Sequence, residues 1–318
     1  MPRIVSLLPS ATEIVCALGA AGELVGISHE CDFPESIRDR AVLTRSRIDV
    51  HGSSGAIDAA VRAVVRNALS IYAVDDELLG ELAPDVIVTQ DLCEVCAVSL
   101  DDVRAALAKL AGRARPGHAR ARGEQGDAVQ IVSLRPTRLA DVLGDVERVA
   151  AGIGRAAQGR ALRAALEARI EAIAERAASA RTRPRVASLE WIEPLMLGGT
   201  WMPELIELAG GVAVGVQTGQ PAPTLDAAAL AELRPDVVIV KPCGFALERA
   251  LAERDVLERS VVQHARASTR IYVTDGNAFF NRPGPRLVES LEILAACLHP
   301  DLFDDFARSH ATVLERLR

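Results

Sequence analysis

Several features that assign proteins to a functional class are scarce in this sequence of 318 residues. Aromatic residues make up only 3% of it, and no apolar run reaches the roughly 18 to 20 residues that a transmembrane helix needs. Acidic side chains outnumber basic ones by 43 to 36, and the net charge is −7. Because nucleic-acid binders concentrate positive charge, this balance predicts that nucleic acid is not a partner.

Cysteine is also sparse, with six residues, too few for a disulfide scaffold in a chain of this length. The first twenty residues do not read as a signal peptide, because Pro9, Ser10 and Glu13 interrupt the apolar region that export needs. We therefore predict a cytoplasmic protein with reduced thiols. The segment from Ser10 to Glu13 instead predicts a capping box, in which Ser10 caps the first helix and Glu13 reaches back to it.

Motifs of common enzyme classes are absent too. The sequence contains neither the GxxxxGK[ST] loop that cradles phosphates nor the GxSxG nucleophile elbow. The glycines Gly152, Gly154 and Gly159 follow a predicted helix instead of a strand, so they do not form a dinucleotide fingerprint. We assign no catalytic residue, and the sequence favours a binding protein over an enzyme.

What the sequence does contain is an alternation of short Val/Ile-rich runs with Ala/Leu-rich helical stretches. This alternation predicts an α/β fold with largely parallel sheets. The segment Leu82-Ala-Pro-Asp-Val-Ile-Val-Thr89 is matched by Leu233-Arg-Pro-Asp-Val-Val-Ile-Val240 in the second half. Since a second, looser match follows the same order, we predict two α/β lobes of similar construction.

The middle of the chain is helical in composition from Thr137 to about Ala180, with a break near Gly152 to Gly159. We expect a long helix here that connects the two lobes. The segment Gly112 to Asp127 has almost no apolar residues and predicts an exposed loop. The predicted division is an N-terminal lobe at 1–136, a connecting helical segment at 137–182 and a C-terminal lobe with terminal helices at 183–318.

Aromatic side chains gather in the segments that follow predicted strands, where open α/β sheets bind their ligands. Six of the ten aromatic residues lie there: Phe33, Trp191, Trp201, Phe245, Phe279 and Phe280. Large rings at a cleft suit a large, flat, partly apolar ligand. The alternative is that these rings close off the lobe cores or hold loops down.

Four cysteines also follow predicted strands, namely Cys31, Cys93, Cys96 and Cys243, and His29 lies two residues before the first of them. A site of thiols and imidazole suits zinc, copper(I) or an iron–sulfur cluster. Three interpretations stay open: a metal or cluster site, a redox dithiol, and thiols that line a ligand pocket.

Three segments resemble a known family: Arg3–Gly19, Pro84–Gln90 and Asn277–Val288. They are similar to the periplasmic binding proteins for cobalamin and iron chelates, which are substrate-binding components of ABC transporters, and most similar to the cobalamin-binding branch. The resemblance implies two Rossmann-like α/β lobes, joined by one long mid-chain helix, with the ligand in the cleft between them. The ligand-binding positions that it implies, together with the rings above, are Ser10, Phe33, Pro34, Trp191, Trp201, Phe245, Asn277, Phe279, Phe280 and Arg282.

The function that follows is non-enzymatic binding of a large metal-bearing small molecule, cobalamin or a related corrinoid, by a cytosolic relative of these transporter components. The resemblance implies an ABC permease as a partner, whereas the missing export signal argues against that role. The alternative is a metalloprotein or redox enzyme in which Cys31, Cys93, Cys96, Cys243 and His29 hold zinc or an iron–sulfur cluster.

Overall fold

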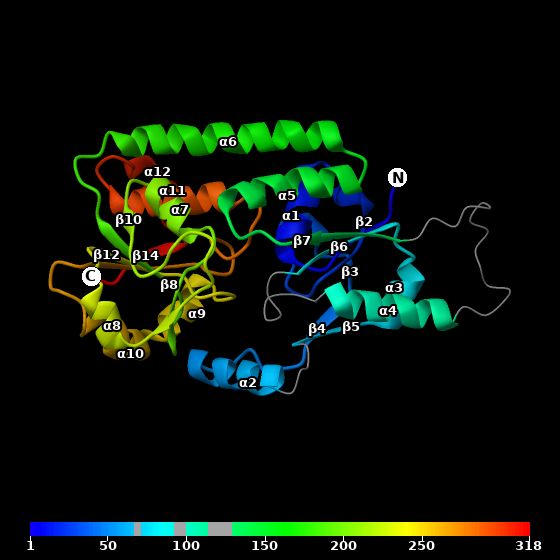
Figure 1. Cartoon of the computed structure of the whole chain (residues 1–318), viewed down its shortest axis with the longest axis horizontal. Helices are drawn as coiled ribbons and strands as arrows, with labels where there is room; N and C mark the ends of the chain where they lie inside the picture. Colours follow the sequence, from blue (N-terminus) through cyan, green and yellow to red (C-terminus); the bar gives the residue numbers. More distant parts are fainter. Residues whose placement is uncertain (67–70, 92–99, 114–128) are drawn as a thin grey trace. The chain divides into compact units, whose positions relative to one another are not determined.

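The computed structural model describes residues 1–66, 71–91, 100–113 and 129–318. Its contacts group these residues into two compact units, each built from strands and helices as predicted (Figure 1). Unit 1 comprises residues 1–50, 59–135 and 144–163, and unit 2 comprises residues 51–58, 136–143 and 164–318. The predicted exposed loop at 112–127 lies almost wholly outside the described residues. None of the described helices is long and apolar enough to cross a membrane.

Unit 1 contains a five-stranded sheet in which every neighbouring pair of strands is parallel. In sheet order its strands are β3 (Ala41–Val42), β2 (Leu24–Ile27), β1 (Ile4–Ser6), β6 (Val86–Gln90) and β7 (Gln130–Leu134). A separate antiparallel pair is formed by β4 (Thr44–Ser46) and β5 (Tyr72–Val74). The helices α1 (Pro9–Ala17), α3 (Asp76–Leu82) and α4 (Leu100–Arg113) lie wholly within this unit. The central strands are fully buried because apolar residues occupy both of their faces.

Unit 2 contains a mixed seven-stranded sheet whose centre is parallel. In order its strands are β11 (Thr224–Leu225), β9 (Leu195–Leu197), β8 (Arg185–Trp191), β12 (Val237–Val240), β13 (Arg270–Thr274) and β14 (Leu314–Arg316), with β10 (Val212–Ala213) beside β8. Its helices are α7 (Met202–Leu208), α8 (Ala227–Glu232), α9 (Leu247–Ala252), α10 (Arg254–Leu257), α11 (Leu287–Leu298) and α12 (Asp304–Ser309). The parallel strands β8, β12 and β13 are apolar runs of the kind that the predicted alternation describes, whereas the antiparallel strands β9, β11 and β14 were not predicted.

The helical segment in the middle of the chain is confirmed. It forms α5 (Leu139–Gly152) and α6 (Ala156–Ala178), and the break between them contains Gly154 with a φ of +74°. A positive φ suits glycine, which has no Cβ to clash. Both helices contribute residues to each unit. The three-part division at 136 and 182 stays a prediction.

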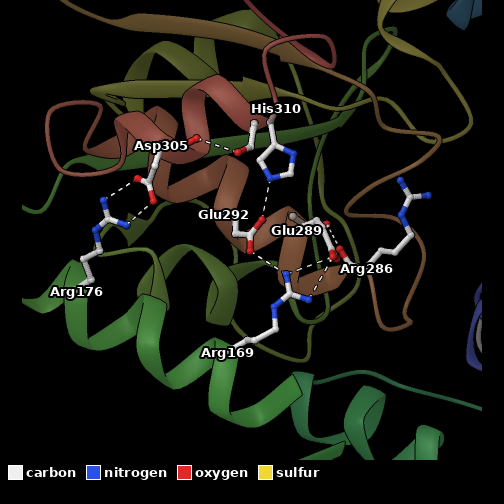
Figure 2. A network of polar contacts seen from close by, with 9 residues as sticks. Arg169, Arg176, Arg286, Glu289, Glu292, Asp305 and His310 are labelled. Carbon is white, nitrogen blue, oxygen red and sulfur yellow. Dashed lines mark hydrogen bonds and ion pairs between the residues drawn. The ribbon is translucent and has the colours of Figure 1, made fainter. Parts of the chain in front are cut away.

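Ion pairs fasten the second half of α6 to α11 and α12 within unit 2, as Figure 2 shows. The Arg169 guanidinium donates to Glu292 at 2.9 Å, and the other oxygen of Glu292 lies 2.8 Å from Nε2 of His310. Nearer the end of the helix, Arg176 forms a two-point pair with Asp305 at 2.7 and 2.9 Å. These pairs give α6 a defined position on the terminal helices.

The predicted capping box at the first helix is wrong. Helix α1 begins at Pro9, its N-cap is Leu8, and no side chain caps it. Proline suits the first helical position because its ring presets φ and its missing N–H has no intrahelical partner there. The helix therefore starts two residues earlier than an N-cap at Ser10 would require, and Ser10 lies inside the first turn, 2% exposed.

Candidate functional site

Three loops of unit 2 meet at one edge of its sheet. The strands β8, β12 and β13 are parallel neighbours, so the segments after them begin at the same edge. In open α/β folds this carboxyl edge is where ligands bind. Trp191 is the last residue of β8, Phe245 lies in the loop after β12, and the loop after β13 contains Asn277 to Arg282.

Trp191 and Phe245 are brought into contact at this edge. Their ring centroids lie 5.2 Å apart in an edge-to-face arrangement, and the Arg249 guanidinium lies 4.0 Å from the Phe245 centroid. Phe245 is only 3% exposed, whereas Trp191 is half-buried. The result is a half-exposed indole supported by a buried ring and a cation, contacts that each contribute of order 1 kcal/mol.

The beginning of α2 (Ser54–Arg66) holds this aromatic cluster in place within unit 2. The Glu253 carboxylate accepts hydrogen bonds from the amide of Ser54 at 2.6 Å and from its hydroxyl at 2.9 Å. Nε1 of Trp191 donates to the Ser54 carbonyl at 3.3 Å and to the Glu193 carbonyl at 3.1 Å. These bonds fix the orientation of the Trp191 ring.

A buried lysine, Lys241, directly follows β12 and was missed by the sequence reasoning. It is 0% exposed, and its Nζ donates to Oδ1 of Asn281 at 2.8 Å and lies 3.6 Å from Oε2 of Glu190. Burial lowers the pKa of Lys241, and the nearby Glu190 carboxylate acts in the opposite direction. The sequence signal that could have identified Lys241 is a charged residue directly after a run of four apolar strand residues.

Asn281 also ties the loops together through its amide group. Its Nδ2 donates to the carbonyl of Lys241 at 3.0 Å and to that of Gly276 at 2.8 Å. In the same loop, Arg282 is 7% exposed and donates to Oδ1 of Asn277 at 3.0 Å. The loop after β13 therefore has a defined conformation at the strand edge.

Asp275 begins this loop and shapes its first turn. Its Oδ1 accepts hydrogen bonds from the amides of Asn277 at 2.9 Å and Ala278 at 2.7 Å. Burial raises the pKa of Asp275, while these two hydrogen bonds act to lower it. An aspartate that binds the amides two and three residues ahead favours this turn conformation.

The other predicted rings pack inside unit 2. Trp201 is 6% exposed and donates from Nε1 to the carbonyl of Phe280 at 2.9 Å. Phe279 is 6% exposed and Phe280 is 0% exposed. With Phe245, four of the six rings match the alternative interpretation, in which the rings close off a core. Their contact with a ligand stays a prediction.

In unit 1 the predicted residues follow β1 and β2. Sγ of the buried Cys31 lies 3.1 Å from Oγ1 of Thr12, which donates to Oγ of Ser6 at 2.8 Å. Further along the loop, Phe33 is 44% exposed and Pro34 is half-buried. Phe33 is the most exposed aromatic side chain in the described part of the chain.

His29 also lies in this loop, and its ring is held by a hydroxyl instead of a thiol. Its Nδ1 is 2.7 Å from Oγ1 of Thr44, and its ring centroid is 5.4 Å from that of Tyr72. The Tyr72 hydroxyl donates to Glu30 at 2.7 Å. Partial burial lowers the pKa of His29, which favours the neutral imidazole.

The structure brings no metal-binding group together among the residues that it describes. No three His, Cys, Asp or Glu side chains are clustered there as metal ligands. Cys31 and His29 belong to unit 1 and the half-buried Cys243 to unit 2. Cys93 and Cys96 lie outside the described residues. The proposed metal site therefore stays a prediction.

Comparison with known proteins gives matches in structure alone. No family model matches the sequence, and no curated protein matches it. A periplasmic heme-binding protein from Pseudomonas aeruginosa superimposes with a TM-score of 0.67 at 18% identity, over 94% of each chain. RhuT, a periplasmic heme-binding protein from Roseiflexus sp. RS-1, gives 0.65 at 20% identity, over 96% of this chain and 99% of its own.

The vitamin B12-binding protein BtuF of Vibrio cholerae gives a TM-score of 0.63 at 19% identity, over 93% of this chain and 96% of its own. Heme-binding and vitamin B12-binding proteins thus match to a similar extent, and the cobalamin branch is not distinguished. The chain has the α/β fold of these periplasmic heme-binding and vitamin B12-binding proteins, as the resemblance implied.

Proposed function

We propose that the chain binds a metal-bearing small molecule without catalysing a reaction on it, and that this molecule is cobalamin or a related corrinoid. The fold supports the first part of the proposal, because the structural neighbours are binding proteins for heme and vitamin B12. The observation that carries it is the half-exposed Trp191 indole at the carboxyl edge of the unit 2 sheet, supported by Phe245 and Arg249.

A macrocycle needs a flat apolar surface that is already in place. The Trp191 ring is held through Nε1 by two backbone carbonyls, so little side-chain freedom is lost when a ligand stacks on it. In unit 1, the exposed ring of Phe33 is a second surface of the same chemistry. Pro34 directly follows Phe33 and Pro194 lies three residues after Trp191, and both prolines limit backbone freedom.

Titration of the purified chain with cyanocobalamin, followed by the visible spectrum of the corrin and by calorimetry, tests the proposal. We expect saturable binding of one ligand per chain at micromolar concentration. Hemin and a ferric hydroxamate chelate are titrated in parallel, because neighbours of this fold bind related ligands. If none of the three binds saturably, the proposal is wrong. Saturable binding of hemin or the chelate alone would refute the corrinoid assignment.

A pair of variants tests whether Trp191 contributes to binding. We expect Trp191→Ala to weaken the binding of cyanocobalamin about five- to tenfold, the effect of losing one aromatic contact. Phe306→Ala is the matched control, since Phe306 is also a half-buried ring of unit 2 with a guanidinium above it, that of Arg176 at 5.4 Å. An equal loss of affinity in both variants would show that Trp191 has no particular role.

A further inference from the structure

Glu190 lies at an irregularity in the sheet of unit 2. The register between β8 and β9 shifts between Leu189 and Trp191, so Glu190 is an extra residue in the strand. Such a bulge redirects a side chain out of the regular alternation. The Glu190 side chain is 28% exposed, and its Oε2 accepts a hydrogen bond from the amide of Gly199 at 3.3 Å.

The buried ammonium of Lys241 holds the same oxygen from the interior. Leu189 pairs with Val240 in the sheet, so Lys241 follows at the level of Glu190. Its Nζ lies 3.6 Å from Oε2 of Glu190 and donates to Asn281 on the other side. Oε1 of Glu190 has no hydrogen-bond partner in the part of the chain that the structure describes. Oε2 of Glu190 is therefore held in position by Lys241, while Oε1 is available to accept hydrogen bonds.

The pair of Lys241 and Glu190 is bordered by a further buried polar group, which lowers the stability of the fold. The Ser188 hydroxyl is 3% exposed and has no hydrogen-bond partner among the described residues. A Cβ built on Gly198 would lie 2.9 Å from Ser188 Oγ and 3.1 Å from Lys241 Nζ, so both polar atoms border the same glycine. Burying an ammonium and an unpaired hydroxyl destabilises a fold, and such departures concentrate at functional sites.

We propose that Glu190, positioned by Lys241, selects the ligand by its hydrogen-bonding groups. The free oxygen accepts a hydrogen bond from a primary amide, and the negative charge disfavours a ligand that brings a carboxylate to this edge. The inference rests on the proposed function and refines it. Corrinoids carry primary amides on their side arms, whereas heme carries two propionates, so Glu190 favours a corrinoid over heme.

The test compares affinities for cyanocobalamin and hemin in the full chain and in Glu190 variants. We expect the wild type to bind cyanocobalamin at least tenfold more tightly than hemin. Glu190→Ala should weaken cyanocobalamin binding about ten- to a hundredfold, the loss of a charge-assisted hydrogen bond. Glu190→Gln keeps an acceptor of the same shape without the charge, so hemin binding should tighten about tenfold.

Glu207→Gln is the control for net charge. Glu207 is exposed on α7 and its side chain has no hydrogen bond or ion pair within the described residues, so we expect this variant to bind both ligands within twofold of the wild type. Lys241→Met, if it folds, should lower the ratio of cyanocobalamin to hemin affinity by weakening cyanocobalamin binding, because Glu190 loses the contact that positions it. Hemin binding should not tighten, because the negative charge of Glu190 is then no longer offset. A role in stability alone would leave that ratio unchanged. Circular dichroism confirms the fold of each variant.

The outcomes separate this inference from the proposed function. Binding of cyanocobalamin that is the same in Glu190→Ala, Glu190→Gln and the wild type overturns the selection by Glu190 and leaves the function intact. Tighter binding of hemin than of cyanocobalamin by the wild type overturns the selection, while binding of a metal-bearing small molecule stands. Binding of neither ligand overturns both.

Discussion

The same substitution, tryptophan to phenylalanine, can be compared at the buried Trp201 and at the half-buried Trp191. Trp201→Phe removes the Nε1–H that donates to the Phe280 carbonyl at 2.9 Å in a buried setting. A buried carbonyl left without a donor costs about 1 to 3 kcal/mol. The smaller ring leaves a void of a few atoms, which costs about 1 kcal/mol more. We therefore expect the free energy of unfolding to fall by about 2 to 4 kcal/mol.

Trp191→Phe is the matched change at a half-exposed position. Water can replace the indole N–H at the Glu193 carbonyl, because this hydrogen bond is exposed. The expected loss in the free energy of unfolding is below about 1 kcal/mol. The order should be reversed for ligand binding, with a larger loss of cyanocobalamin affinity in Trp191→Phe than in folded Trp201→Phe, because Trp191 is half-buried and Trp201 is 6% exposed.

Urea unfolding followed by far-ultraviolet circular dichroism measures both variants. Tryptophan fluorescence is unsuitable, because the chain has only two tryptophans and each variant removes one. Equal destabilisation by the two substitutions would refute the reasoning from burial. A loss below 1 kcal/mol in Trp201→Phe would refute the assigned role of its hydrogen bond.

Three further predictions concern stability. Burial lowers the pKa of His299 below its ordinary value of 6.5, so the unfolded chain takes up the proton first. The urea midpoint should therefore fall as the pH drops below about 6.5, and His299→Gln should flatten this dependence; an unchanged slope would contradict the assignment. Gly210 has a φ of +81°, and a Cβ there would lie 2.7 Å from Nε2 of His299. Gly210→Ala should therefore lower the free energy of unfolding by about 2 kcal/mol or more in urea titrations, and a neutral effect would show that the turn relaxes. A double-mutant cycle with Arg169→Ala and Glu292→Gln should give a coupling of about 0.5 to 1 kcal/mol, since solvent screens the half-exposed Arg169. Strictly additive thermal shifts would show that this pair does not contribute.

Elements whose pattern is local were predictable from the sequence. The run Val237–Val240 is a buried strand, and Met202–Leu208 is a helix, because β-branched residues favour strands and the helix begins with a well-placed proline. The short antiparallel strands β9 and β11 lack such a pattern. Two or three residues carry too little periodicity, and their pairing depends on neighbours supplied by the sheet.

The candidate site was predictable only in outline. Its place after the parallel strands followed from the α/β alternation, which led to Trp191 and Phe245. Lys241 was overlooked because its partners, Asn281 and Glu190, lie 40 and 51 positions away in the sequence. Only the tertiary structure shows that the charge of Lys241 is buried and that Glu190 and Asn281 lie beside it.

The sequence by itself determined the alternation of strands and helices, the long helical middle and the resemblance to a family of binding proteins. The tertiary structure alone decided which aromatic rings are buried, because each exposed fraction depends on the elements packed around the ring. It placed Ser54 against Trp191, 137 positions away, and brought Lys241 beneath Glu190. Such contacts depend on sheet register and loop conformation, which short-range patterns of residues do not encode.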